Sequence, residues 1–222
     1  MTGGQGQVPD GWPAANRDNM TWIPKYDYPA VRDTKAAVRW LRANADTYGV
    51  DASKIAMFGD SAGACSADGV AMVREEDYKG ELTSAQDSTL ASTFLEQSSA
   101  VAAVLDHWGS DVIAKQLTKR DGIDRCTKDN APLAIFHGTA DGLVPYKNAL
   151  QLDAGYNRTG VAHQLFPLLG QGHGCWNALT EQDQTQDEAG YGFLARVMRL
   201  GNQGRADVLG FREERQLQKN ML

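Results

Sequence analysis

The pentapeptide Gly59-Asp60-Ser61-Ala62-Gly63 constrains the fold of this chain more than any other stretch. It fits the pattern G-x-S-x-G, in which a serine occupies a sharp turn between a strand and a helix. The apolar run 55–58 before it predicts a buried strand, and the small residues of 62–73 after it predict a helix. We expect both glycines to be required, because a side chain at either position would collide with the neighbouring strand or helix. The turn would lift the hydroxyl of Ser61 clear of the sheet.

Strand-like and helical patterns alternate along the rest of the chain. Further apolar runs that predict strands occupy residues 101–105, 133–136 and 164–169. Helical patterns occupy residues 112–117, 147–156 and 190–200. Pro167 interrupts the last strand and favours a position at the sheet edge, where a missing N–H is tolerated. Strands alternating with helices are typical of an α/β fold with a mostly parallel sheet flanked by helices.

The convincing first helix begins at Pro29, which suits a first turn, and ends at Gly49, which suits a helix stop. Its periodicity predicts one apolar face with Val31, Thr34, Val38, Leu41, Ala45 and Tyr48, and an outward face with Lys35, Arg39 and Arg42. The chain therefore divides into an irregular segment 1–28, a domain over 29–200 and a charged tail over 201–222.

Charge and hydropathy argue against several classes of protein. The 222 residues carry a formal net charge of −6, which disfavours nucleic acid or an anionic membrane surface as a partner. No apolar run approaches the roughly 20 residues of a transmembrane helix. Residues 1–5 show neither the basic start nor the apolar stretch of a secretion signal, so we expect a cytoplasmic protein.

Cysteine and histidine spacings indicate no metal site and no other cofactor. The chain has no C-x-x-C or H-E-x-x-H pair, the spacings typical of zinc ligands. Its three cysteines, Cys65, Cys126 and Cys175, fit free thiols better than a disulfide framework, with a Cys65–Cys175 bridge as the alternative.

A serine nucleophile needs a base that takes its proton and a third group that orients this base. The chain has four histidines. His107 and His137 adjoin predicted strands and His163 begins one, whereas His173 stands in the glycine-rich loop 170–174 after the last strand. Because such a loop can bring an imidazole over the serine, we predict His173 as the base, with an unrelated loop histidine as the alternative.

The orienting acid should follow the strand before that one. Asp141 does so, although Asp141-Gly142 also fits an ordinary turn, and Asp106 after the preceding strand is a competitor. The order Ser61, Asp141, His173 is the chain order of the Ser-Asp-His hydrolases with this serine turn.

Between about residues 28 and 198 the chain resembles the esterase and lipase group of the α/β-hydrolase superfamily, the carboxylesterases related to hormone-sensitive lipase. The matching motifs are the helix 28–45, the strand entry 48–55, and the segments Gly59–Gly63, His137–Pro145 and Gly172–Gly174. The resemblance implies Ser61 as nucleophile, Asp141 as acid, His173 as base and a small-molecule ester as substrate.

The chain departs from these esterases at one motif. They carry a His-Gly-Gly-Gly type loop whose backbone N–H groups form half of the oxyanion hole, and neither this motif nor the strands that normally precede it occur here. The N–H of Ala62 is the oxyanion donor that remains, and Gly3 or Gly4 is a candidate substitute for the other. A sheet shortened in this way exposes one edge, so we expect a homodimer that pairs there.

The sequence therefore predicts a serine carboxylic-ester hydrolase that acts on short acyl esters through an acyl-enzyme intermediate. Trp108 and Trp176 are candidates to line its pocket, with ordinary packing as the alternative. Two other functions stay open. One is a serine peptidase of the prolyl-oligopeptidase type, which Asp60 and Ala62 beside the serine disfavour. The other is a truncated, non-catalytic remnant that acts in binding.

Overall fold

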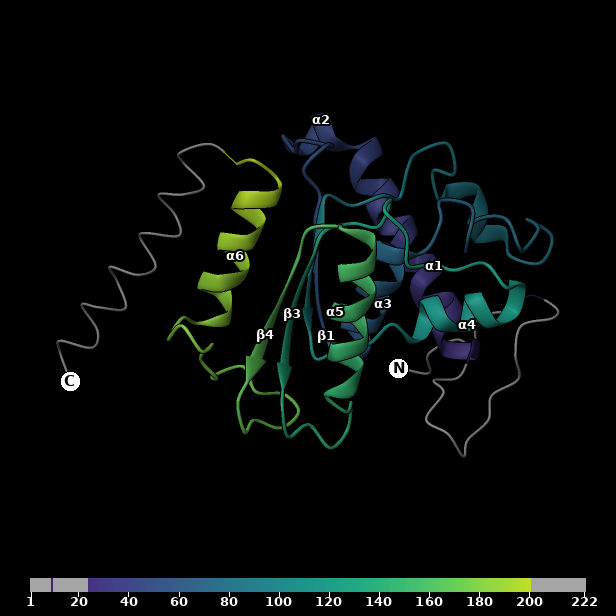
Figure 1. Ribbon diagram of the computed structural model, residues 1–222. Helices are drawn as coiled ribbons and strands as arrows, with labels where there is room; N and C mark the ends of the chain where they lie inside the picture. The colour runs from purple at the N-terminus through teal and green to yellow at the C-terminus, as the bar shows by residue number, and fades with distance from the viewer. Residues whose placement is uncertain (1–8, 10–23, 201–222) are drawn as a thin grey trace.

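The structure is a computed structural model that describes residue 9 and residues 24–200. Its sheet has four parallel strands in the order β1 (Ala56–Asp60), β2 (Ala103–His107), β3 (Leu133–Gly138) and β4 (His163–Leu168) (Figure 1). This confirms the predicted α/β class and the edge position of the strand with Pro167. The predicted tail 201–222, Gly3 and Gly4 lie outside the described residues.

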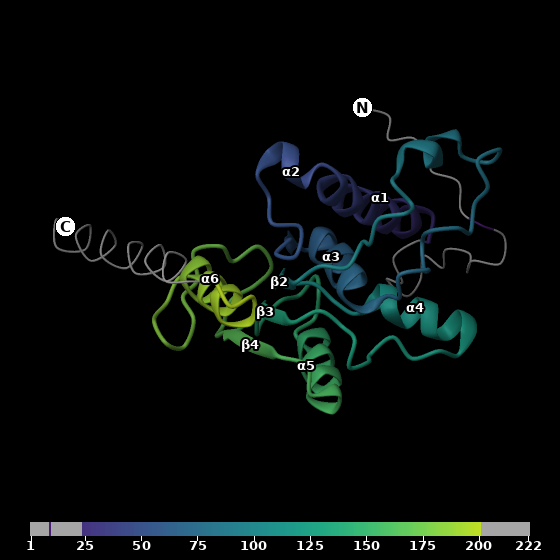
Figure 2. The same cartoon turned by 90° about the horizontal axis from the view of Figure 1, so that it is seen from above.

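Helices cover both faces of the sheet (Figure 2). The helices are α1 (Pro24–Ala43), α2 (Ala45–Tyr48), α3 (Ala62–Met72), α4 (Val112–Asp121), α5 (Lys147–Thr159) and α6 (Gln186–Val197), with a 3₁₀ helix η2 (Ser88–Ser92). Helices α3 and α5 pack on one face, α1 packs outside α3, and α6 lies on the opposite face. None of the helices in the described part is long and apolar enough to cross a bilayer.

Strands β2 and β3 are buried along their whole length because both of their faces are covered. Val104 and Ile135 belong to the core cluster under α3 and α5, whereas Leu105 and Phe136 belong to the cluster under α6. Alternation along each strand thus builds two apolar layers, and this leaves the carboxyl ends of the strands free to carry polar loops.

Helix α1 differs from its prediction at its beginning. It begins at Pro24 rather than Pro29, so residues 24–28 of the predicted irregular segment are helical and Pro29 lies inside the helix. Pro24 takes the first helical position, where its missing N–H has no intrahelical partner to lose. The predicted single helix is divided in the structure, since α1 ends at Ala43 and the short α2 follows it; Gly49 stops α2, with φ of 65°.

The predicted outward face of α1 is wrong for Lys35 and Arg39, which are both about 1% exposed. The Nζ of Lys35 donates to the carbonyl oxygens of Arg74 at 2.9 Å and Asp77 at 2.5 Å. The Nε of Arg39 donates to the carbonyl oxygen of Thr93 at 2.8 Å. The segment 74–99 packs across α1, and these two cations satisfy its buried carbonyls.

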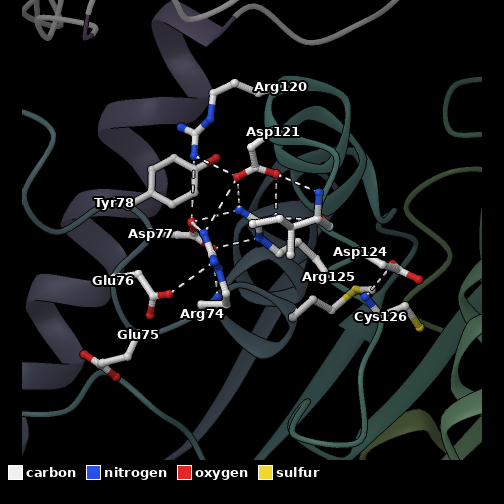
Figure 3. Close-up of polar contacts among 12 residues, drawn as sticks. Arg74, Glu75, Glu76, Asp77, Tyr78, Arg120, Asp121, Asp124, Arg125 and Cys126 are labelled. Carbon is white, nitrogen blue, oxygen red and sulfur yellow. Dashed lines mark hydrogen bonds and ion pairs between the residues drawn. The ribbon is translucent and has the colours of Figure 1, made fainter.

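A buried ion network fastens this segment to the end of α4 (Figure 3). The Nε and Nη2 of Arg125 donate to the two carboxylate oxygens of Asp77 at 2.9 Å each, and Nη2 also donates to Asp121 at 2.7 Å. Burial raises the pKa of Asp77, but hydrogen bonds from Arg125 and Arg74 outweigh it and hold this pKa below its usual range. The side chains of Asp77 and Arg125 are 2% and 0% exposed, so the pair is bidentate and nearly dry.

One edge of the described sheet is open. Strand β1 pairs with β2 alone among the described residues, and its Phe58, predicted to be buried, is 56% exposed. The ring of Phe58 lies 5.7 Å from that of Trp176, which is 44% exposed. Pairing of a second copy at this edge stays a prediction.

Candidate active site

Ser61 occupies the turn between β1 and α3 with φ of 52° and ψ of −119°. This is a conformation that residues with a Cβ rarely adopt, and neighbouring hydrogen bonds hold it. The N–H of Ser61 donates to the carbonyl oxygen of His107 on β2 at 2.9 Å, and its own carbonyl accepts from the N–H of Cys65 at 3.0 Å. The predicted strand, turn and helix are therefore present, with the serine between them.

The two glycines of the pentapeptide have different roles. A Cβ on Gly59 would lie 2.5 Å from the carbonyl carbon and oxygen of Gly63, so only glycine fits there. A Cβ on Gly63 would meet no atom within 4 Å. The prediction is therefore correct for Gly59 and wrong for Gly63, because Gly63 lies on the exposed side of the first turn of α3.

His173 joins the other two predicted residues. Its Nε2 lies 2.9 Å from the Oγ of Ser61, and its Nδ1 lies 2.8 Å from the Oδ2 of Asp141. With a proton on Nδ1, the ring donates to the carboxylate and accepts from the serine hydroxyl through Nε2. The three side chains follow β1, β3 and β4 at their carboxyl ends, which meet at one edge of the parallel sheet.

Asp141 is held in place by its own loop. Its Oδ1 accepts from the N–H groups of Leu143 at 2.8 Å and Val144 at 2.9 Å, while Oδ2 faces His173. Burial raises the pKa of Asp141, but hydrogen bonds from His173 and from these two amides outweigh it, so this pKa lies below its usual range. The carboxylate is therefore ionised at neutral pH and able to stabilise a charged imidazole.

Comparison with known proteins finds esterases of similar sequence and fold. The family model BD-FAE matches residues 18–125, a range that contains Ser61 and ends before Asp141 and His173. Esterase LipC of Mycobacterium tuberculosis is 25% identical over 185 residues, which are 74% of this chain and 45% of LipC. The structure of Thermogutta terrifontis esterase 2 phosphorylated by paraoxon is similar with a TM-score of 0.57 and 26% identity. That match covers 77% of this chain and 64% of the esterase.

The chain has the α/β-hydrolase fold of these esterases. These relatives are esterases, and the chain spans less than half of LipC and less than two thirds of the Thermogutta enzyme. The acetyl ester-xyloside bifunctional hydrolase of Caldicellulosiruptor lactoaceticus shares the fold, with 18% identity and a TM-score of 0.50 over 65% of this chain and 56% of its own.

The remaining candidates for base and acid lie elsewhere in the fold. His107 is buried against Phe136 with ring centroids 4.7 Å apart, and burial lowers its pKa to about 4. His163 lies at the start of β4, with its Nδ1 2.9 Å from the carbonyl oxygen of Val161. The competitor Asp106 is fully buried, and its Oδ1 accepts from the N–H of Gly109.

The ring of His137 contacts the loop that carries Asp141. The sequence placed His137 beside a strand and did not predict this contact. It is fully buried, its Nε2 lies 2.8 Å from the carbonyl oxygen of Val144, and the same nitrogen lies 3.5 Å from the Oδ2 of Asp141. Burial lowers the pKa of His137, so the neutral ring can donate to the Val144 carbonyl. The histidine next to the acid thus fixes the turn that presents Asp141.

Ala62 begins α3 directly after Ser61. The first N–H groups of a helix have no intrahelical acceptor and lie at the positive end of its dipole. The N–H of Ala62 is therefore available to a developing negative charge beside Ser61. The candidate substitute donors Gly3 and Gly4 are outside the described residues.

The two tryptophans singled out in the sequence lie near the histidine. Trp108 is fully buried with φ of 50°, and its ring centroid lies 6.1 Å from that of His173 in an edge-on contact. Trp176 packs against Trp108 at 4.7 Å between ring centroids and extends this aromatic cluster towards the exposed Phe58.

The three cysteines are free thiols, as the sequence predicts. Cys65, Cys126 and Cys175 form no disulfide with one another.

Proposed function

We propose that this chain is a serine carboxylic-ester hydrolase that acts on short acyl esters of small molecules. The observation that carries the proposal is the pair of contacts made by His173, 2.9 Å to the Oγ of Ser61 and 2.8 Å to Asp141. This is the arrangement that activates a serine hydroxyl. The similarity to esterases supports the ester as the substrate class.

In the proposed mechanism the Nε2 of His173 takes the proton of Ser61 while Oγ attacks the ester carbonyl carbon. Asp141 keeps the proton on Nδ1 and stabilises the charged ring. The N–H of Ala62 donates to the tetrahedral oxyanion. The C–O bond to the alcohol then breaks, His173 gives its proton to the leaving oxygen, and an acyl-enzyme remains. Water, deprotonated by the same imidazole, attacks this acyl group and releases the acid.

The experiment that tests this function is hydrolysis of p-nitrophenyl butyrate by the chain beside its Ser61→Ala variant. We expect turnover to fall by at least about 1,000-fold, because removal of the nucleophile leaves only binding and the oxyanion donor. Ser53→Ala is the matched control, since the hydroxyl of Ser53 bonds only to the exposed Asp51. Equal hydrolysis by the Ser61→Ala variant would refute the proposal.

Organophosphate labelling separates an esterase from a non-catalytic remnant. Esterase 2 of Thermogutta terrifontis is phosphorylated by paraoxon. We propose that paraoxon phosphorylates Ser61 here, detected by mass spectrometry of the peptide that contains it. An unlabelled Ser61 in folded protein would favour the remnant. Matched amide and ester substrates test the peptidase alternative. Faster hydrolysis of the amide would favour the peptidase, and hydrolysis of the ester alone would exclude it.

A further inference from the structure

Two carboxylic acids face each other in the core beneath the Ser61 turn, and the proposed ester hydrolysis does not use them. Asp68 lies on α3 about two turns beyond Ser61, and Asp106 lies on β2 in register with Gly59. Both are fully buried, and α3 packs directly on β2.

The backbone of Gly109 brings the two acids together. Its N–H donates to the Oδ1 of Asp106 at 2.6 Å. The place that a Cβ of Gly109 would take lies 2.6 Å from this oxygen and 2.8 Å from the Oδ2 of Asp68. The same point lies 2.6 Å from the Cβ of Ala64. The turn after β2 is thus pressed against α3, with one carboxyl from each element beside it.

Among the residues that the structure describes, none supplies a positive charge to this pair. The titratable groups that face it are Cys65 of α3, Asp111 before α4 and Tyr156 of α5. The Nζ of Lys115 lies 2.8 Å from the Oδ1 of Asp111, so this cation pairs with Asp111 and not with Asp68 or Asp106. Two buried carboxylates without a cation cannot both be ionised at low cost. Burial raises the pKa of both acids, and the negative charge of Asp106 raises that of Asp68 further.

We propose that Asp68 and Asp106 share one proton and act as a positioning pair for the proposed esterase site. Neutral Asp68 donates its proton in a hydrogen bond to the Asp106 carboxylate, which in turn accepts from the N–H of Gly109. This bond locks α3 to the turn 107–110. The inference rests on the proposed function for its effect on turnover, but the shared proton exists in the resting protein.

The hydrogen bond between Asp68 and Asp106 connects the element that carries Ser61 with the turn that contacts His173. Helix α3 begins at the nucleophile turn, and the N–H of Ser61 donates to the carbonyl oxygen of His107. The turn 107–110 also carries Trp108, whose ring packs edge-on against His173. A shift of α3 relative to this turn would therefore change the distance between Ser61 and His173, and misplacement by about 1 Å can cost about 100-fold in rate.

The first test compares Asp68→Asn with Asp68→Ala in p-nitrophenyl butyrate hydrolysis across pH. The asparagine amide still donates to Asp106, so we expect kcat at neutral pH within about 3-fold of the parent. The alanine leaves the Asp106 carboxylate without this donor, and we expect kcat to fall about 10- to 100-fold with little change in KM. The parent should lose kcat towards alkaline pH as the shared proton leaves, and Asp68→Asn should lack this decline. Equal damage in the two variants, or an unchanged alkaline decline in Asp68→Asn, would overturn the proposal.

The second test needs no turnover and remains informative if Asp68→Ala does not fold. Infrared spectra of the resting protein in the mildly alkaline range should show the carbonyl stretch of one protonated carboxyl group. This band should vanish in Asp68→Asn and persist in the control Asp77→Asn, whose carboxylate lies in the separate ion network with Arg125. Absence of the band in the parent would overturn the shared proton. Its presence in a parent that does not hydrolyse esters would refute only the proposed function.

Discussion

The Nε2 of His173 lies 2.9 Å from the Oγ of Ser61, across 112 positions of sequence. Three strands (β2, β3 and β4) and three α-helices (α3, α4 and α5) separate the two residues along the chain, yet both residues follow carboxyl ends of strands in the same parallel sheet. We therefore expect substitutions at this contact to change activity, and substitutions elsewhere in the fold to change stability or assembly.

Asp141→Asn should lower kcat by about 10³- to 10⁴-fold while the fold is retained. The amide cannot keep the proton on Nδ1 of His173 as the carboxylate does, so the wrong tautomer faces Ser61. Steady-state hydrolysis of p-nitrophenyl butyrate measures this loss. His163→Ala is the control, because its ring lies at the start of β4 beside Asp153 and away from Ser61. A similar loss in both variants would contradict the assigned role of Asp141.

Gly59→Ala and Gly63→Ala should change stability in opposite directions. The alanine at 59 would press on the backbone of Gly63 at 2.5 Å, which we expect to cost about 1–3 kcal/mol or more. The alanine at 63 meets open space inside a helix and should stabilise the fold by about 0.5–1 kcal/mol. Urea unfolding of both variants measures the difference, and equal destabilisation would show that the turn is packed differently.

Arg125→Met should destabilise the fold by about 3–5 kcal/mol, because it leaves the Asp77 carboxylate buried without its bidentate partner. Activity of the folded fraction should not change, since the ion pairs of this network join Asp77 and Asp121 to arginines and not to Ser61, Asp141 or His173.

The same ion pair predicts how stability depends on acid pH. The pKa of Asp77 in the folded protein lies below its ordinary value of 3.8. Its contribution is therefore present above that value and is lost as pH falls through the folded pKa. Urea midpoints measured from neutral to acid pH should fall less steeply in Arg125→Met than in the parent. An equally steep fall in both proteins would speak against this assignment.

A second copy should pair along β1, whose outer edge is unpaired among the described residues. Light scattering at working concentration should then give a dimer mass, and Phe58→Lys should shift it towards the monomer by placing charge on the exposed ring position. Leu150→Lys, on the exposed side of α5, is the matched control. A monomer mass for the parent protein would remove this expectation.

The strand, turn and helix around Ser61 could be predicted from sequence because their signals are local. The apolar run before Gly59 and the small residues after Gly63 specify a strand and a helix without reference to any distant segment. The order of Ser61, Asp141 and His173 could also be predicted, because each residue follows a recognisable strand and parallel strands bring such positions to one edge.

Other features depend on which segment packs against an element, and periodicity does not contain that information. Lys35 and Arg39 have the sequence pattern of a solvated face, but the segment 74–99 covers them and they donate to its carbonyls. Phe58 has the pattern of a buried strand residue, but α6 does not cover it. The sequence pattern predicts that Gly59 and Gly63 are both required, but only at Gly59 would a Cβ collide with backbone atoms.

The sequence by itself determined the α/β class, the serine turn and the identity of the three polar residues that meet there, because strand and helix signals are short-range. Only the tertiary structure decided that Asp68 and Asp106 face each other beside Gly109, that Asp77 pairs with Arg125, and that His137 braces the loop of Asp141. Those contacts join residues on different elements, and their energies depend on burial and on mutual distance, which exist only once the chain has folded.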